Sequence, residues 1–217
     1  MSSIADIVSR REISEIVHFT TNKGLVGIFG VGAVLSRERL KKEDYLEYVY
    51  HPNASTRKDE DWLGHVNLSI SKINTKYFDH STRTHAHTDV WWCALAFDPE
   101  MLSHEGVFFA TTNNIYSRCR RAEGPAGLEA LFAERIERWR GNRVTREDQM
   151  PDNLPTCYQA EVLYPRELML DGLLKVYVAR GHHADIVASA RDILLVPGES
   201  GPAHEIPIVI DPDAFEP

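Results

Sequence analysis

Short runs of alternating or continuous apolar residues dominate the chain and predict more strands than long helices. Helical spacing and capping residues predict four helices: one after Ser2 or Ser3 to about residue 13, one capped by Asn22 and ended by Gly30 and Gly32, and two over 127–139 and 182–190. Because the strands do not alternate regularly with long helices, we expect an α+β fold rather than a doubly wound sheet. The predicted strands are 15–20, 33–35, 65–71, 91–97, 107–110, 158–164, 174–178 and 206–210.

The predicted strand 158–164 carries a carboxylate and an amide in an otherwise apolar run. Residues two apart in a strand point to the same face, so Gln159 and Glu161 are expected to project together. The polar, proline-punctuated loop 145–155 precedes this strand, and loops held on a rigid strand often carry function. The pattern alone also fits a strand with one solvated face.

Length and composition favour one soluble domain over residues 1–217. The chain has 217 residues and 43% hydrophobic content, enough for one core. No apolar run approaches the roughly 20 residues that cross a bilayer, and the first residues lack a basic region followed by an apolar one. We therefore expect a cytoplasmic protein without a membrane partner. Three widely spaced cysteines, Cys93, Cys119 and Cys157, are expected to be buried thiols rather than disulfides.

Arginines gather in one stretch although the formal net charge is −8. The acidic total argues against nucleic-acid binding by bulk charge. Arginine binds phosphate and stacks on bases, so a local groove for a nucleic-acid strand is one interpretation. A solvated helix with i,i+4 pairs such as Glu134–Arg138 is the other. The stretch contains Arg118, Arg120, Arg121, Arg135, Arg138, Arg140, Arg143 and Arg146.

Three histidines raise the alternative of a zinc site. His85 and His87 form a His-x-His pair, and His80 lies close by in the sequence. Hydrophilic residues surround them, which favours a surface loop, so we expect no metal.

Two distant motifs, in the same order, resemble the DarT family of toxins. The Gln-x-Glu of strand 158–164 is similar to the catalytic strand of mono-ADP-ribosyltransferases, and with Pro165, Leu168 and the strand 174–178 it resembles the C-terminal part of DarT. The run 16–20, with Leu25, Ile28 and the segment 32–36, is similar to the opening His-x-Thr segment of that family. The resemblance extends from about residue 16 to about residue 186.

The resemblance implies an ADP-ribosyltransferase-like fold with two small packed, mostly antiparallel sheets and flanking helices. It also implies an NAD-dependent enzyme that attaches ADP-ribose to guanine or thymine in single-stranded DNA, with NAD as co-substrate and no metal. Such an enzyme would be a toxin, and its partner an antitoxin with ADP-ribosyl-hydrolase activity. An unpaired base enters a pocket without first leaving a stack, which favours single-stranded DNA.

The resemblance also assigns roles to individual residues. Glu161 is expected to be catalytic, since a fixed anion stabilises the cationic ribose that forms when nicotinamide leaves. Arg57 is the candidate for the NAD phosphates and for transition-state support, with Arg37 and Arg39 as competitors. Gly24 replaces an asparagine that family members often carry. The remaining expected residues are His18, Thr20, Leu25 and Ser69 (with Asn67) for NAD, and Gln159, Asn153 and Arg146 for the acceptor.

Two questions stay open at this point. The sequence Asn67-Leu68-Ser69 stands where the thymine-modifying branch has a Phe-Tyr-Phe-like sequence, which suggests the guanine-modifying branch. The alternatives in function are a transferase that acts on RNA or protein, and a non-catalytic relative that binds nucleotides or nucleic acid.

Overall fold

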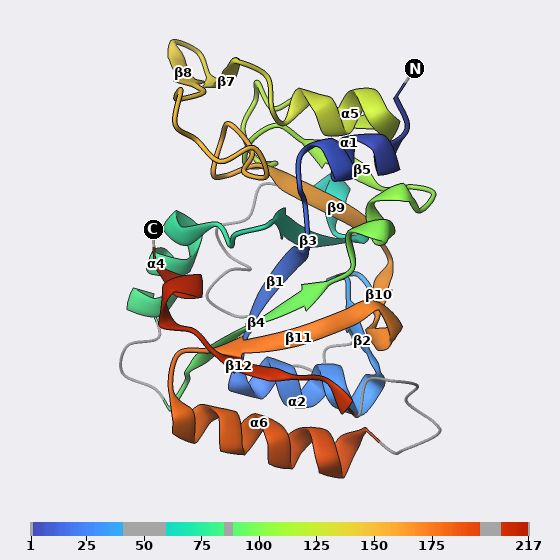
Figure 1. Cartoon of the computed structure of the whole chain (residues 1–217), viewed down its shortest axis with the longest axis vertical. Helices are drawn as coiled ribbons and strands as arrows, with labels where there is room; N and C mark the ends of the chain where they lie inside the picture. The colour runs from blue at the N-terminus through green and yellow to red at the C-terminus, as the bar shows by residue number, and fades with distance from the viewer. Residues whose placement is uncertain (1, 41–59, 85–88, 196–204, 217) are drawn as a thin grey trace.

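The structure, a computed structural model, describes residues 2–40, 60–84, 89–195 and 205–216. An eight-stranded sheet runs through these residues in the order β12-β11-β4-β1-β3-β9-β5-β6 (Figure 1). Its neighbouring strands are antiparallel except β11 and β12, which are parallel. In sheet order the strands are β12 (Ile208–Ile210), β11 (Leu173–Val178), β4 (Trp92–Phe97), β1 (Ile16–Thr21), β3 (His65–Ile70), β9 (Glu161–Pro165), β5 (Phe108–Ala110) and β6 (Arg121–Glu123).

The contact between β1 and β3 divides this sheet into two halves. These strands pair only through Ile16 with Ile70 and Val17 with Ser69. Four strands, β12 to β1, lie on one side of this short ladder, and four, β3 to β6, lie on the other. The predicted α+β fold with mostly antiparallel strands is confirmed, and the two small sheets that we expected are the halves of one sheet.

The main hydrophobic core lies on one face of the sheet, under helices from both halves. Helices α2 (Asn22–Val31) and α6 (Gly181–Leu194) lie side by side against the first half, and α1 (Ile4–Arg10) and α5 (Gly124–Ala130) cover the second (Figure 1). Helix α4 (Thr75–Thr84) packs Phe78 on Val17 and Ala94, which belong to the opposite face. The short 3-10 helices are η2 (Glu60–Trp62), η3 (Pro99–Ser103), η4 (Leu170–Gly172) and η6 (Pro212–Phe215).

Local sequence sets the ends of the helices. Ser3 caps α1 by accepting a hydrogen bond from the Asp6 backbone N–H at 3.1 Å. Thr21, not the predicted Asn22, caps α2, accepting from the Gly24 N–H at 3.1 Å. The Asn22 side chain instead accepts from the Trp91 N–H at 3.3 Å, which ties the start of α2 to the segment before β4. Gly32 ends α2 with φ of 76°, a conformation that favours glycine.

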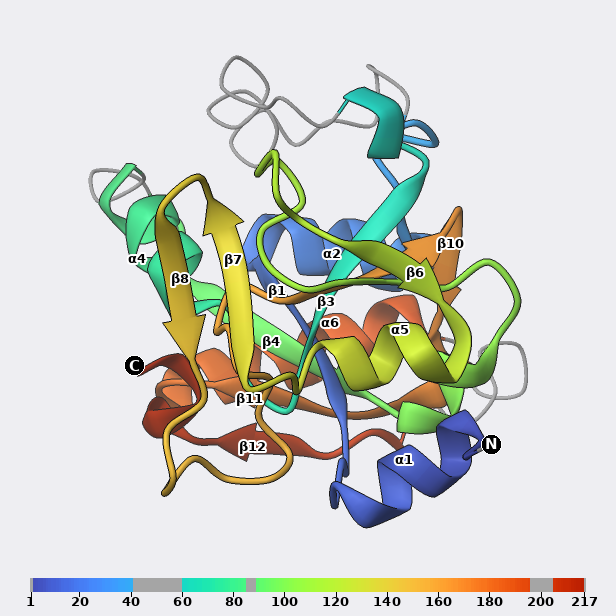
Figure 2. The same ribbon diagram turned by 90° about the horizontal axis from the view of Figure 1, so that it is seen from above.

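The prediction of a helix over 127–139 is wrong. Helix α5 ends at Ala130, and the arginine-rich stretch continues as a two-stranded hairpin, β7 (Arg135–Trp139) with β8 (Asn142–Thr145) (Figure 2). The backbone carbonyl of Glu134 accepts the Arg146 N–H at 2.8 Å, a contact between the two ends of the hairpin. Gly141, with φ of 78°, forms the turn. A second small sheet pairs β2 (Ala33–Leu35) with β10 (Glu167–Met169).

Cys93, Cys119 and Cys157 are buried free thiols, as expected. Within the described ranges, no helix combines the length and apolar character needed to cross a bilayer.

Candidate functional site

The short ladder between β1 and β3 ends where the predicted site residues meet. Beyond Val17 and Ser69 the two strands are no longer paired. The imidazole Nδ1 of His18 then lies 3.0 Å from the backbone oxygen of Asn67. A side chain of β1 thus takes the place of a ladder hydrogen bond, and it holds the two halves of the sheet together at this point.

Glu161 lies on the other side of Asn67. Its Oε2 accepts hydrogen bonds from Asn67 Nδ2 at 3.2 Å and from the Asn114 backbone N–H at 3.0 Å. Asn67 is opposite Leu163 in the β3–β9 ladder, so its side chain projects from the same face as Glu161. Two donors that point at one oxygen fix the carboxylate, which is half-buried at the first residue of β9.

Arg121 fixes the loop that carries Asn114. Its Nε donates to Asn114 Oδ1 and its Nη2 to the Asn114 carbonyl, while Nη1 donates to the Cys119 carbonyl at 3.3 Å. Ala110 pairs with both Glu161 and Arg121, so the carboxylate and the guanidinium project from one row of three neighbouring strands. Asn114 is only 3% exposed. Arg121 therefore determines where the N–H that binds Glu161 lies.

The environment of His18 favours its neutral form. Burial lowers the pKa of His18 from its ordinary value, and the hydrogen bond to Asn67 opposes this only in part. A carbonyl oxygen can only accept, so the proton of the neutral ring is on Nδ1. Nε2 then carries a lone pair, which can accept a hydrogen bond from a hydroxyl or an amide of a ligand.

The other residues predicted to bind NAD lie close to His18 in the fold. Thr20 is buried on β1. A Cβ at position 24 would lie 2.3 Å from the Thr20 Oγ1, so glycine in place of the family's asparagine leaves room for the hydroxyl. Leu25 is 2% exposed and packs in the main core, so a contact with a cofactor would come from its backbone. Ser69 is half-buried in the two-pair ladder, opposite Val17.

Gln159 is not on the strand face that we predicted for it. Strand β9 begins at Glu161, and Gln159 lies in the turn before it. Its side chain is buried between two partners: Oε1 accepts from Arg138 Nη1 and Nε2 donates to the Tyr116 hydroxyl, both at 3.3 Å. The amide therefore joins the β7–β8 hairpin to the turn before β9.

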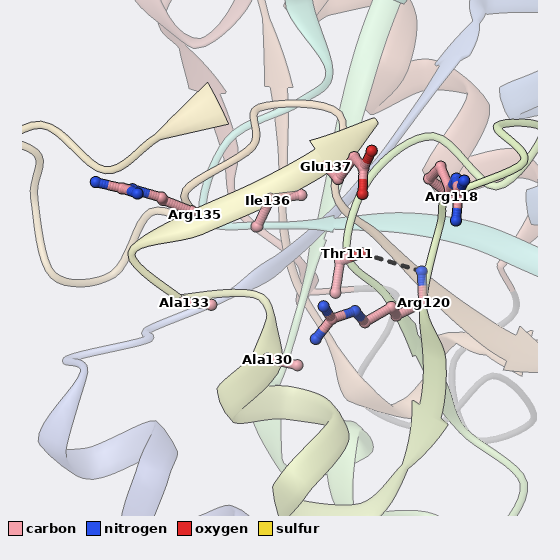
Figure 3. Close-up of a pocket in the computed structure, with 8 residues that line it drawn as sticks. All are labelled: Thr111, Arg118, Arg120, Ala130, Ala133, Arg135, Ile136 and Glu137. Carbon is pink, nitrogen blue, oxygen red and sulfur yellow. Dashed lines mark hydrogen bonds between the residues drawn. The ribbon is translucent and has the colours of Figure 1, made fainter. Parts of the chain in front are cut away.

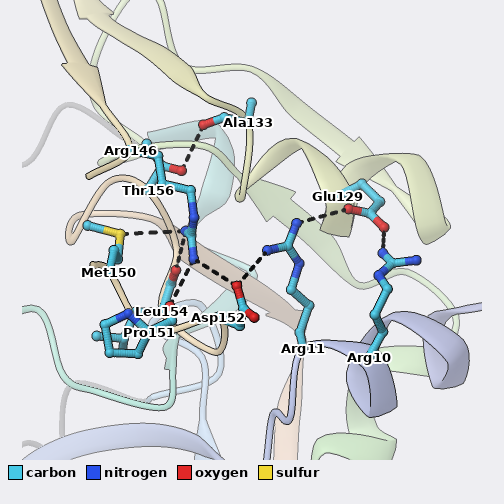
Figure 4. A network of polar contacts seen from close by, with 10 residues as sticks. All are labelled: Arg10, Arg11, Glu129, Ala133, Arg146, Met150, Pro151, Asp152, Leu154 and Thr156. Atoms are coloured by element: carbon cyan, nitrogen blue, oxygen red, sulfur yellow. Dashed lines mark hydrogen bonds and ion pairs between the residues drawn. The ribbon is translucent and has the colours of Figure 1, made fainter. Parts of the chain in front are cut away.

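Arg146 holds its own loop together. Its guanidinium donates to the carbonyls of Leu154 and Pro151, each at 2.8 Å, and its Nη2 lies 3.8 Å from the carboxylate of Asp152 (Figure 4). These contacts occupy the side chain that we predicted to bind the acceptor, because the proline-rich loop turns back over it. Asn153 is half-buried in the same loop.

Arg57, the arginine predicted to contact the NAD phosphates, lies outside the described residues. Of its two competitors, Arg39 forms an ion pair with Glu167 at 3.2 Å, and Arg37 is half-buried. His85 and His87 are also outside the described residues. In the part of the chain that the structure describes, no group of three or more metal-ligating side chains is placed to hold an ion.

Sequence reasoning missed the residues that support Glu161 and Gln159. Asn114 and Tyr116 carried no motif of their own, and Arg121 and Arg138 were two arginines among eight. The roles of Asn114 and Arg121 depend on the strand register of β5, β6 and β9, which brings together segments that are far apart in the sequence. Asn67 was named as a neighbour of Ser69, not as a partner of Glu161.

Comparisons with known proteins identify one family. The family model described as "ssDNA thymidine ADP-ribosyltransferase, DarT" matches residues 17–216. Among solved structures, Thermus sp. 2.9 DarT in complex with carba-NAD+ gives a TM-score of 0.64 at 13% identity, over 94% of this chain and 98% of that one. The same protein in complex with ADP-ribosylated ssDNA gives 0.63 at 13% identity, over 94% and 97%.

A longer protein has a similar fold. Thermosipho africanus DarTG in complex with ADP-ribose gives a TM-score of 0.59 at 12% identity, and the match covers 93% of this chain and 51% of that one. A search of curated protein sequences finds no match. At these identities the solved structures show a shared fold.

Proposed function

Because the chain belongs to the DarT family of single-stranded DNA ADP-ribosyltransferases, we propose that Glu161, with Asn67 and His18 beside it, marks the site where the chain transfers ADP-ribose from NAD to a DNA base. The chain is an NAD-dependent ADP-ribosyltransferase of a toxin family, and NAD is its co-substrate. Single-stranded DNA is the acceptor, as in the Thermus complex with ADP-ribosylated ssDNA.

The observation that carries the assignment of the site is the fixed carboxylate of Glu161. In the reaction the bond between the ribose C1′ and the nicotinamide nitrogen breaks, and its electron pair leaves with nicotinamide. Positive charge develops on the ribose, and an anion held in place by two hydrogen bonds stabilises it without having to reorganise. A nucleophilic atom of the base then bonds to C1′, and Glu161 accepts the proton that the base loses.

The NAD side of the site is the region around His18. Its Nε2 can accept a hydrogen bond from a ribose hydroxyl or from the nicotinamide amide. Thr20 and the backbone of Leu25 continue this region along β1 and the start of α2. Ser69 keeps its predicted role on the neighbouring strand, and Arg57 keeps its predicted role at the phosphates.

The acceptor side lies before Glu161 in the chain. Gln159 precedes the carboxylate by two residues and is held by Arg138 and Tyr116, so its role is to fix the surface that the acceptor meets. Asn153 remains a predicted acceptor contact, and Arg146 holds the loop in which Asn153 lies.

Two further proposals concern the base and the partner. The family description names thymidine, which makes thymine the first base to test, and the Asn67-Leu68-Ser69 sequence makes guanine the second. The Thermosipho DarTG complex with ADP-ribose supports an antitoxin that removes ADP-ribose from the modified DNA. The three free buried thiols fit a reducing compartment, so we place the reaction in the cytoplasm.

The test uses four single-stranded oligonucleotides that are identical except for one central base. Each is incubated with NAD and the purified protein, digested to nucleosides and analysed for added ADP-ribose. The proposal expects one of the four bases to be modified, and matched RNA oligonucleotides to react less. The proposal is refuted if ADP-ribose is found only on the RNA oligonucleotides, or only on the protein itself.

A further inference from the structure

Two exposed aromatic rings lie beside the start of the catalytic strand. Trp139 is 39% exposed and Tyr158 is 45% exposed. The guanidinium carbon of Arg138 lies 5.1 Å from the centre of the Trp139 ring and 5.8 Å from that of Tyr158. We call Arg138, Trp139 and Tyr158 the aromatic platform. Exposed rings with a guanidinium beside them are the usual surface on which unpaired bases stack.

Hydrogen bonds connect the aromatic platform to the site of reaction. Arg138 Nη1 donates to the Tyr158 hydroxyl and to Gln159 Oε1, both at 3.3 Å. Tyr116, which binds the other end of the Gln159 amide, packs its ring edge-on against Trp139, with 5.0 Å between the ring centres. The platform is therefore held in a fixed position beside Gln159, and its Tyr158 lies three residues before Glu161.

A small cavity lined by arginines lies at the other end of β7. Its volume is about 40 Å³, and Arg118, Arg120 and Arg135 line it, with Glu137 as the acidic residue among its walls (Figure 3). The guanidinium of Arg135 points away from those of Arg118 and Arg120 (Figure 3), so we call Arg118 and Arg120 the arginine pocket. Across the described ranges, no ion pair is formed by Arg118 or Arg120, and Arg135 has only a 4.0 Å contact with Glu134. The pocket thus carries excess positive charge.

Strand β7 connects the two surfaces, because its first residues line the cavity beside the arginine pocket and its last two belong to the platform. Arg135 is at the start of β7, and Arg138 and Trp139 are at its end. Three residues of a strand span roughly 10 Å, a distance that neighbouring nucleotides of one flexible strand can bridge. The platform offers ring faces for bases, and the pocket offers guanidinium groups for phosphates.

We infer that the aromatic platform and the arginine pocket hold the acceptor strand on one side of the target nucleotide. This inference rests on the proposed function. A base next to the target stacks on Trp139 and Tyr158, and a phosphate of the same strand lies beside Arg118 and Arg120. A duplex covers the faces of its bases, so this surface selects an unpaired strand.

The first test replaces single bases of a reactive oligonucleotide by abasic sites, one position at a time. For the wild-type protein we expect one position next to the target at which the abasic site raises both the Kd and the KM of the oligonucleotide. The stacking of one base is worth about 1–3 kcal/mol, so the increase is about 5- to 150-fold. In Trp139→Ala the same abasic site should cause no further increase in the Kd or the KM. In Trp139→Phe, which keeps an aromatic ring, the abasic site should again cause most of the increase seen with the wild type.

The second test measures how binding depends on salt. The double variant Arg118→Gln with Arg120→Gln should reduce the magnitude of the slope of log K against log salt by about 0.7 to 1.4, which is about 0.7 for each lost phosphate contact of a single strand. Arg83→Gln is the matched control, because Arg83 is exposed on α4, on the opposite face of the sheet from the main core. Its slope should equal that of the wild type.

Two results would overturn the inference: no position at which the abasic site and Trp139→Ala are coupled, or an unchanged slope in the double arginine variant. Binding is measured separately from reaction, so the failure of the proposed function is distinguishable. A protein that binds the strand through these residues but transfers no ADP-ribose refutes the function, whereas transfer that depends on Glu161 without the coupling refutes only this inference.

Discussion

The side-chain amide of Asn67 donates a hydrogen bond to the carboxylate of Glu161 at 3.2 Å. The backbone oxygen of the same asparagine lies 3.0 Å from Nδ1 of His18. One residue of β3 therefore connects the proposed NAD side of the site, on β1, with the proposed catalytic group, on β9. The split of the sheet makes this possible, because the β1–β3 ladder ends after two pairs.

Replacing Asn67 by aspartate should change the pH dependence of the reaction. The variant Asn67→Asp keeps the shape of the side chain but places a second carboxylate beside Glu161. Two adjacent carboxylates resist simultaneous ionisation. We expect the acid limb of the kcat/KM profile to move to higher pH, which rates measured from pH 5 to 9 would show. An unchanged profile would mean that Asn67 does not act on the Glu161 carboxylate.

Removing the Arg121 guanidinium should lower kcat more than it changes the KM for NAD. In Arg121→Gln the loop that carries Asn114 loses three hydrogen bonds, so the N–H that positions Glu161 is no longer fixed. A displacement of about 1 Å near a reacting group can cost on the order of 100-fold in rate. Arg143→Gln is the control, because Arg143 is an exposed arginine on the hairpin, and its kcat should equal that of the wild type. A loss confined to KM would argue against a positioning role.

Gly24 and Gly27 offer a matched pair of substitutions in α2. A Cβ at Gly24 would collide with the Thr20 hydroxyl, whereas a Cβ at Gly27 meets nothing within 4 Å. Gly24→Ala should therefore weaken NAD binding by about tenfold, the equivalent of one hydrogen bond. Gly27→Ala should leave NAD affinity unchanged and stabilise the protein by about 0.5–1 kcal/mol. Titration calorimetry measures the NAD affinity, and denaturant unfolding measures the stability. Equal NAD affinities in the two variants would contradict a role for the Thr20 hydroxyl in NAD binding.

Much of the fold could be predicted because burial leaves a clear pattern in strands. The runs 91–97 and 174–178 are strands in the structure to within a residue of their predicted ends. The stretch 127–139 could not be predicted in this way, since arginine and glutamate favour helices locally. Pairing of Arg135–Trp139 with Asn142–Thr145 overrides that preference. The turn between the two strands is Arg140-Gly141, and this glycine between two short runs was the signal for the hairpin.

The candidate site was only partly visible in the sequence. His18 and Glu161 could be named because each lies in a compact motif. The contribution of Asn114 depends on a loop that β5 and β6 place over β9, and no spacing along the chain encodes such a contact. Gln159 was expected on the strand, but the turn that precedes β9 ends only at Ala160.

Protonation of His18 should cost stability in acid. Burial holds the pKa of His18 below its ordinary value of 6.5, so the unfolded chain binds the proton more readily than the folded one. The contribution of His18 is complete above pH 6.5 and is lost as the pH falls through and below that value, by up to about 1.4 kcal/mol per pH unit. Denaturant unfolding at several pH values between 7 and 5 should show a shallower loss in His18→Asn. If the free energy of unfolding fell equally with pH in the wild type and in His18→Asn, His18 would not be the source of the loss.

The most direct test of the catalytic assignment compares the wild-type protein with Glu161→Gln on one reactive single-stranded oligonucleotide. The substitution keeps the size of the side chain and removes its charge, so NAD binding should persist while the rate of transfer falls by on the order of 100- to 1000-fold. Mass analysis of the oligonucleotide after incubation with NAD measures the transfer. We expect added ADP-ribose with the wild type and almost none with Glu161→Gln, and equal modification by the two proteins would contradict a catalytic role for Glu161.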